Sequence, residues 1–292
     1  MLFCIFALLA ALTLVGAFWD YEIANAVYIG ESFEENPFGI IFAYVGIIPA
    51  FLGWSFFGAS IIALIRRSEL TKRKRGWLKA LAVILLLLSC FYFPNTLMLV
   101  NANAFSVHFL IAYPIGISAI VGAAYLGYRM AKSSDNPRLL SRVSFIAIVS
   151  IAAVLIIAST KGIMDRPRFR LVLSESDPRL FKSFWQRGSE IKAELFGDAV
   201  SDEFSSFPSG HSAYSMLSVL VLPLIAEYKT ECFRYKRPLA ALGFVWWAAT
   251  ALSRMTVGAH YLTDVSIAAI VTLTVYAVSC FIDKKLDLRS KL

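Results

Sequence analysis

The sequence predicts an all-α, polytopic membrane protein with about eight transmembrane helices. Its 292 residues are 58% hydrophobic and only 16% charged, whereas soluble globular proteins are about 25% charged. Several apolar runs reach the roughly 20 residues that a helix needs to cross a bilayer. These runs lack the alternation of apolar and polar residues that marks strands, and a spanning helix satisfies its own backbone hydrogen bonds. The four cysteines fall mostly within apolar segments, which does not indicate a disulfide framework.

Eight apolar segments are expected to cross the membrane. They cover residues 2–18, 40–65, 77–97, 106–128, 143–160, 212–228, 239–253 and 264–282. The first lacks a basic N-terminal region, so we expect a retained helix and not a cleaved signal peptide. Between the fifth and sixth spans, residues 179–196 mix aromatic and charged side chains. This pattern predicts an amphipathic helix on the membrane surface, bent or broken at Gly188.

The charges of the connecting segments predict the orientation in the membrane. Every second loop is rich in Lys and Arg, whereas residues 19–39 contain five acidic residues and no basic one. The positive-inside rule then places the basic loops and both termini in the cytoplasm. The net charge of +8 reflects this topology and attraction to anionic membrane lipids, so nucleic acid is not an expected partner. Loops 161–211 and 254–263 fall together on the non-cytoplasmic face.

The loop that begins at Lys161 carries basic residues on the face where few are expected. Arg166, Arg168 and Arg170 follow it within nine residues. A cation at the end of an apolar run is costly unless it reaches the interface or binds an anion. Planar guanidinium groups and an ammonium group together suit phosphate oxygens. The pattern therefore predicts an anion site, with phosphate as the best fit.

The same loop ends at Pro208-Ser209-Gly210-His211, directly before an expected span. Proline stops any preceding helix, and glycine allows a ligand to approach the backbone closely. The first N–H groups of a helix have no partner within the helix and attract anions. A lone histidine here is more often a structural residue, but in this context we expect His211 beside a bound anion.

A third stretch, residues 253–264, contains Arg254, His260 and Asp264 between two apolar segments. If it is helical, His260 and Asp264 share one face, where a carboxylate can orient an imidazole. A satisfied structural pair is the alternative. The chain has three histidines, and His108 lies outside these stretches, so we expect it at the membrane interface.

Together the three stretches resemble the three-part signature of the type 2 phosphatidic-acid phosphatase superfamily. The matching pieces are Lys161 with six residues to Arg168, then Pro208-Ser209-Gly210-His211, then Ser253-Arg254 with five residues to His260 and three more to Asp264. The family usually has Arg-Pro at the end of the first piece, whereas Phe169 follows Arg168 here. An Arg-Pro does occur at Arg166, but only four residues separate it from Lys161. The spacing favours Arg168 as the phosphate ligand and leaves Arg166 as the alternative.

The resemblance implies a phosphate-binding set and a catalytic set of residues. The phosphate oxygens would be held by Lys161, Arg168, Arg254 and the backbone N–H groups of Ser209 and Gly210. His260 would attack phosphorus to form a phosphohistidine, His211 would protonate the leaving oxygen and then activate water, and Asp264 would orient His260. These roles match what phosphoryl transfer needs. We expect no cofactor and no metal, because three cations supply the charge and the sequence lacks clustered acidic or histidine ligands.

The chain is therefore divided into N-terminal transmembrane helices, residues 1–142, and a catalytic transmembrane core, residues 143–292. The resemblance implies a core of six spans, so the first two are an addition. The expected function is hydrolysis of a lipid phosphate or polyprenyl diphosphate, such as phosphatidic acid or undecaprenyl diphosphate, in a bacterial plasma membrane. Its expected partners are this substrate and the membrane lipids. A lipid phosphotransferase, or a non-enzymatic lipid-binding or transport protein, is the alternative, although two histidines so placed argue against simple binding.

Overall fold

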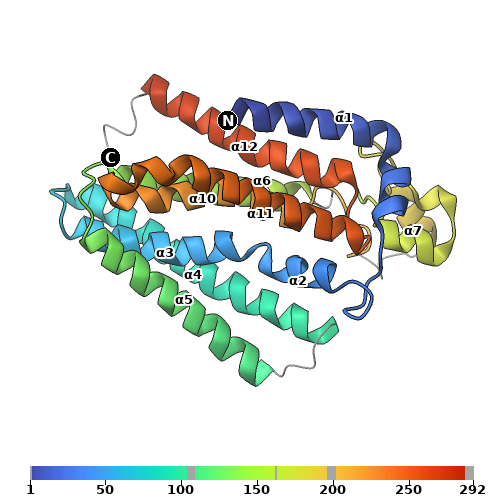
Figure 1. Cartoon of the computed structure of the whole chain (residues 1–292), viewed down its shortest axis with the longest axis horizontal. Coiled ribbons are helices and arrows are strands. Elements are labelled where there is room, and N and C mark those ends of the chain that lie inside the picture. The colour runs from blue at the N-terminus through green and yellow to red at the C-terminus, as the bar shows by residue number, and fades with distance from the viewer. Residues whose placement is uncertain (1, 104–108, 162, 196–201, 287–292) are drawn as a thin grey trace. The chain divides into compact units, whose positions relative to one another are not determined.

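The computed structural model describes residues 2–103, 109–161, 163–195 and 202–286, and all regular elements in these ranges are helices (Figure 1). The predicted all-α class is thereby confirmed. The α-helices are α1 (Leu2–Val27), α2 (Pro37–Val45), α3 (Ile48–Ile65), α4 (Lys72–Asn103), α5 (Phe109–Lys132), α6 (Leu139–Thr160), α7 (Phe169–Glu175), α8 (Ser189–Leu195), α9 (Gly210–Met216), α10 (Ser218–Ile225), α11 (Lys236–Thr256) and α12 (Leu262–Leu286). Short 3-10 turns are η1 (Pro178–Leu180), η2 (Ala226–Tyr228) and η3 (Thr230–Tyr235).

Five stretches of the described chain are long and apolar enough to cross a membrane, as an integral membrane protein requires. They are Leu2–Val27, Pro37–Ile65, Lys72–Tyr92, Leu139–Thr160 and Leu262–Lys285. The count of eight spans stays a prediction, as do the orientation and the position of the termini. His108 lies outside the described residues.

Three expected segments are interrupted. The second expected span is divided into α2 and α3, and a proline occupies the first turn of α3, where its missing N–H is tolerated. The sixth is divided into α9 and α10. The predicted amphipathic helix over 179–196 is wrong, because within the described part, residues 179–195, only the end of η1 and α8 are helical. A Cβ on Gly188 would come within 2.0 Å of the carbonyl oxygen of Asp165, so the backbone at Gly188 serves a close chain crossing.

One compact unit comprises Met1–Ala43, Ala152–Met216 and Trp247–Val275. Within it α1 runs beside the first part of α12 (Figure 1), and Thr13 Oγ1 donates to Ser266 Oγ across the two helices at 2.8 Å. Phe169 and Tyr261 pack with Ala24 in a buried apolar cluster. Every residue of the predicted site belongs to this unit.

A second compact unit comprises Tyr44–Ile151, Leu217–Trp246 and Tyr276–Leu292. Its helices α3, α4 and α5 lie side by side (Figure 1). Small and hydroxyl residues bring these helices close, as is common in membrane proteins. For example, a Cβ on Gly127 would lie 2.1 Å from the carbonyl oxygen of Phe56, and Ser55 Oγ donates to the carbonyl of Ile120 at 2.8 Å.

Candidate active site

The loop between α11 and α12 carries His260. Helix α11 ends at Thr256, and Gly258 adopts φ +65°, a left-handed conformation that glycine takes without strain. The chain then folds back, with the N–H groups of Ala259 and His260 donating to the carbonyl of Arg254 at 3.0 and 3.2 Å. Residues 253–264 are therefore not one helix, and the expectation that His260 and Asp264 share a helical face is wrong.

Asp264 instead lies near His260 because its carboxylate folds back to cap the start of α12. It lies in the first turn of α12, and its Oδ2 accepts the N–H of Tyr261 at 2.8 Å, the return half of a capping box. The same oxygen accepts Ser206 Oγ–H at 2.6 Å and lies 3.8 Å from Nδ1 of His260. The carboxylate is thus close enough to stabilise a cationic imidazole, although it is not the hydrogen-bond partner of the ring.

The hydrogen bond that orients His260 comes from the backbone of Ser206. His260 Nδ1 lies 2.6 Å from the carbonyl oxygen of Ser206. Because a carbonyl oxygen only accepts, Nδ1 must carry the proton, which leaves the lone pair on Nε2. The side chain is 2% exposed, and burial lowers the pKa of His260 to about 3. The imidazole is therefore neutral, with a nucleophilic Nε2, at physiological pH.

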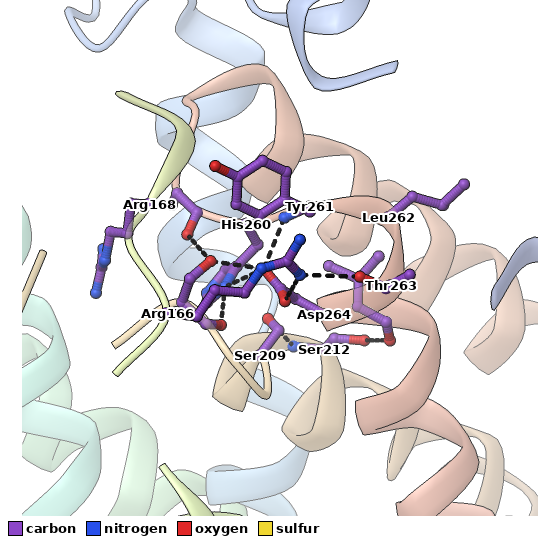
Figure 2. Close-up of polar contacts among 12 residues, drawn as sticks. Arg166, Arg168, Ser209, Ser212, His260, Tyr261, Leu262, Thr263 and Asp264 are labelled. Carbon is purple, nitrogen blue, oxygen red and sulfur yellow. Dashed lines mark hydrogen bonds and ion pairs between the residues drawn. The ribbon is translucent and has the colours of Figure 1, made fainter. Parts of the chain in front are cut away.

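Arg166 is fully buried and holds Asp264 from the other side. Its Nη1 donates to Asp264 Oδ1 at 2.5 Å and to Thr263 Oγ1 at 2.9 Å (Figure 2). Its Nη2 donates to Asp20 Oδ2 at 2.9 Å, and its Nε donates to the carbonyl of Lys182 at 2.8 Å. The guanidinium also lies 4.0 Å from the centre of the Tyr261 ring. All three of its nitrogens are directed to protein oxygens, so the structure does not favour Arg166 as a phosphate ligand.

Arg168 has a different environment. Its side chain is mostly buried, and Nη2 pairs with Asp202 Oδ1 at 2.8 Å, but the Asp202 side chain is 75% exposed. Nε donates to the carbonyl of Asp202 at 3.0 Å. Figure 2 shows Arg168 directed away from the Arg166 and Asp264 network. An exposed carboxylate is a weakly held partner, so Arg168 is the better placed of the two arginines to exchange it for an anionic ligand.

The cations and histidines of the three motifs affect one another electrostatically. Burial, followed by the charges of Arg168 and Arg254, lowers the pKa of Lys161. Burial lowers the pKa of His211 well below its usual value, and Arg254, His260, Lys161 and Arg168 lower it further. These mutual effects require the groups to be near one another. The structure thus brings together Lys161, Arg168, His211, Arg254 and His260.

Gly210 lies within this cluster, whereas the backbone of Ser209 is already engaged. A Cβ on Gly210 would be 3.8 Å from Cε of Lys161. Ser209 precedes the first residue of α9, and its Oγ accepts the N–H of Ser212 at 3.3 Å, as an N-cap does. The N–H of Ser209, however, donates to the carbonyl of Asp264 at 3.2 Å. The expectation that this N–H binds phosphate is therefore not supported, and Gly210 remains the backbone candidate.

Sequence reasoning missed two contributors to the site, Asp20 and Ser206. Asp20 was expected in an acidic loop, but α1 continues to Val27 and the carboxylate is buried. The sequence did offer one signal: Asp20 lies just after the apolar run 2–18. A charged residue buried at the end of such a run needs a partner. Ser206 directly precedes the Pro208 motif, but nothing in its type indicated that its carbonyl would bind an imidazole.

The part of the chain that the structure describes contains no group of three or more His, Cys, Asp or Glu side chains arranged to hold a metal ion.

The family model described as the PAP2 superfamily matches residues 139–286, just over half of the chain. The match includes all three motifs. No curated protein matches the chain significantly, and no solved structure does so either.

Proposed function

The chain belongs to the PAP2 superfamily, and from that premise we propose that it hydrolyses a lipid phosphate or polyprenyl diphosphate through a phosphohistidine at His260. Membership indicates phosphatase activity on phosphate esters. The apolar helices favour a substrate that is itself held in the membrane. The substrate class and the covalent intermediate are our proposal.

The observation that carries the proposal is the cluster of cations around two neutral histidines. Burial, and after it the charges of neighbouring cations, lowers the pKa of both Lys161 and His211. Such a site is unfavourable until negative charge enters it, and a phosphate group supplies two negative charges with oxygens for each cation. Arg168, Lys161 and Arg254 would bind these oxygens, together with the N–H of Gly210.

The tautomer of His260 suits it to act as the nucleophile. Nε2 attacks phosphorus in line as the bond from phosphorus to the leaving oxygen breaks. The ring then becomes cationic, and its Nδ1–H is held by the Ser206 carbonyl, with the Asp264 carboxylate 3.8 Å away. Water later attacks phosphorus, the bond to Nε2 breaks, and His260 returns to its neutral form.

His211 would be the general acid and then the general base. In the free protein, burial and then the surrounding cations hold its pKa well below the usual value, so it is neutral. Bound phosphate offsets those cations and raises the pKa, which lets His211 carry the proton that it gives to the leaving oxygen. It then takes a proton from the attacking water. A phosphotransferase would use the same steps with a lipid hydroxyl in place of water.

The test is phosphate release by the purified full-length protein in detergent, with a panel of lipid phosphates and polyprenyl diphosphates. His260→Ala should reduce release to background, whereas His108→Ala, a matched histidine outside the motifs, should retain it. EDTA should leave the rate unchanged, because cationic side chains supply the charge stabilisation. Turnover by His260→Ala would contradict the mechanism, and transfer to an added lipid without free phosphate would identify a transferase.

A further inference from the structure

The buried carboxylate of Asp20 links α1 to the proposed nucleophile, although α1 lies outside the matched family region of residues 139–286. A non-helical residue, Trp19 (φ −131°, ψ 25°), bends α1 directly before Asp20. The side chain of Asp20 is 4% exposed. An ionised group so deeply buried is costly unless its partners are well placed, so its partners indicate what it does.

Asp20 binds the start of α12. Its Oδ1 accepts the N–H of Thr263 at 3.0 Å, and its Oδ2 accepts a short hydrogen bond from Thr263 Oγ1. The first N–H groups of a helix lack partners within the helix and favour negative charge. Asp20 therefore supplies, from a distant part of the chain, a cap for the helix that carries Asp264.

Asp20 also holds Arg166. The ion pair between Arg166 Nη2 and Asp20 Oδ2 is 2.9 Å long, while Nη1 of the same guanidinium holds Asp264. The rigid plane of the guanidinium transmits the position of one carboxylate to the other. One buried cation is thus shared by two buried carboxylates, and it cannot move toward either without weakening the other pair.

Two further hydrogen bonds connect Asp264 to the imidazole of His260. With Oδ1 of Asp264 held by Arg166, its Oδ2 is free to bind the hydroxyl of Ser206 at 2.6 Å. The carbonyl of Ser206 in turn accepts Nδ1–H of His260 at 2.6 Å. The orientation and tautomer of the ring therefore depend on this chain of contacts.

We propose that Asp20 is a positioning residue, which holds Arg166 and the start of α12 in the arrangement that orients His260. This inference rests on the proposed role of His260 as the nucleophile. It also assigns a task to α1: the helix completes the support of the active site. Asp20 itself touches no reacting atom.

Asp20→Asn, which keeps the shape of the side chain and removes its charge, tests the inference. We expect kcat for phosphate release to fall about 10- to 100-fold, the effect of a small misplacement of a reacting group, while KM stays close to the wild-type value. Asp20→Glu, which restores the charge, should recover part of kcat. A wild-type kcat in Asp20→Asn would overturn the inference, as would a loss expressed only in KM.

Thr13→Val is the matched control. It removes the hydrogen bond between Thr13 and Ser266, which joins the same two helices, but it leaves Arg166 and Asp264 untouched. Its kcat should remain at the wild-type level. An equal loss of kcat in Thr13→Val and Asp20→Asn would show that α1 acts only by general packing and would overturn the positioning role.

An independent readout separates this inference from the proposed function. The chain has three histidines, so selective ¹⁵N-histidine labelling gives few imidazole signals, and His260→Ala identifies that of His260. Asp20→Asn should shift the His260 nitrogens, and Thr13→Val should not. If the wild-type protein turns over no lipid phosphate, the proposed function fails while the spectra still decide on Asp20; unchanged spectra would overturn the inference.

Gly16→Ala provides a second variant if Asp20→Asn does not fold. A Cβ on Gly16 would lie 2.8 Å from Asp20 Oδ1 and 2.9 Å from Thr263 Cγ2, so alanine displaces the carboxylate but keeps its charge. We expect the same loss of kcat with little change in KM. A wild-type kcat would overturn the inference in this variant too.

Discussion

Replacing Arg166 should mainly destabilise the protein, whereas replacing Arg168 should mainly impair catalysis. Arg166→Met leaves the carboxylates of Asp20 and Asp264, 4% and 0% exposed, without their shared cation. Removing one partner of a buried ion pair costs about 3–5 kcal/mol. For a chain of this size that corresponds to a fall in Tm of about 6–20 °C.

Arg168→Met should cost much less stability, because its partner Asp202 is 75% exposed and can be solvated by water. Exposed ion pairs contribute about 0–1 kcal/mol. Its kcat/KM should instead fall about 10- to 100-fold, since a hydrogen bond to a charged group contributes about 1.5–3 kcal/mol. Each variant thus serves as the control for the other.

The assay is thermal unfolding of both variants in the same detergent, together with phosphate release below the unfolding temperature. The reasoning would be refuted if the two variants unfolded at the same temperature. It would also be refuted if Arg166→Met folded normally and lost affinity for substrate, because Arg166 would then be the phosphate ligand.

Two further predictions concern pH and a transition-state mimic. Burial lowers the pKa of His260 to about 3, whereas an unfolded histidine has a pKa of about 6.5. Between these two pH values the unfolded chain binds a proton that the folded protein does not. The free energy of unfolding therefore falls as the pH drops, by about 1.4 kcal/mol per pH unit. Unfolding midpoints at pH 5, 6 and 7 should therefore fall less steeply for His260→Gln than for the wild-type protein, and equal slopes would contradict this. Vanadate, which adopts the trigonal-bipyramidal geometry of in-line attack, should inhibit phosphate release by the wild-type protein; full activity in its presence would argue strongly against a phosphohistidine.

The membrane character and the residues of the candidate site could be predicted from local features of the sequence. Apolar runs indicate helices whatever their neighbours are, because a bilayer offers no other hydrogen-bond partners. The spacings that connect Lys161 to Arg168, and Arg254 to His260, led to residues that lie close together in the structure. The number of spans, their orientation and the boundary at residue 142 stay predictions.

The contacts within the site could not be predicted from local features. A histidine and an aspartate four residues apart suggested a helical pair, but Gly258 turns the chain before them, and the ring bonds to the Ser206 carbonyl, 54 residues away in the sequence. Every residue has a backbone carbonyl, so a sequence motif cannot indicate which carbonyl accepts a hydrogen bond from the imidazole.

Composition and spacing were thus enough to predict a helical membrane protein and to select the cations and histidines of a candidate phosphate site, because both depend on residue type and local order. Only the tertiary structure assigned different roles to Arg166 and Arg168 and showed that α1 contacts the site. The role of a guanidinium depends on which carboxylates surround it, and Asp20, the partner that distinguishes Arg166 from Arg168, lies 146 residues away in the sequence.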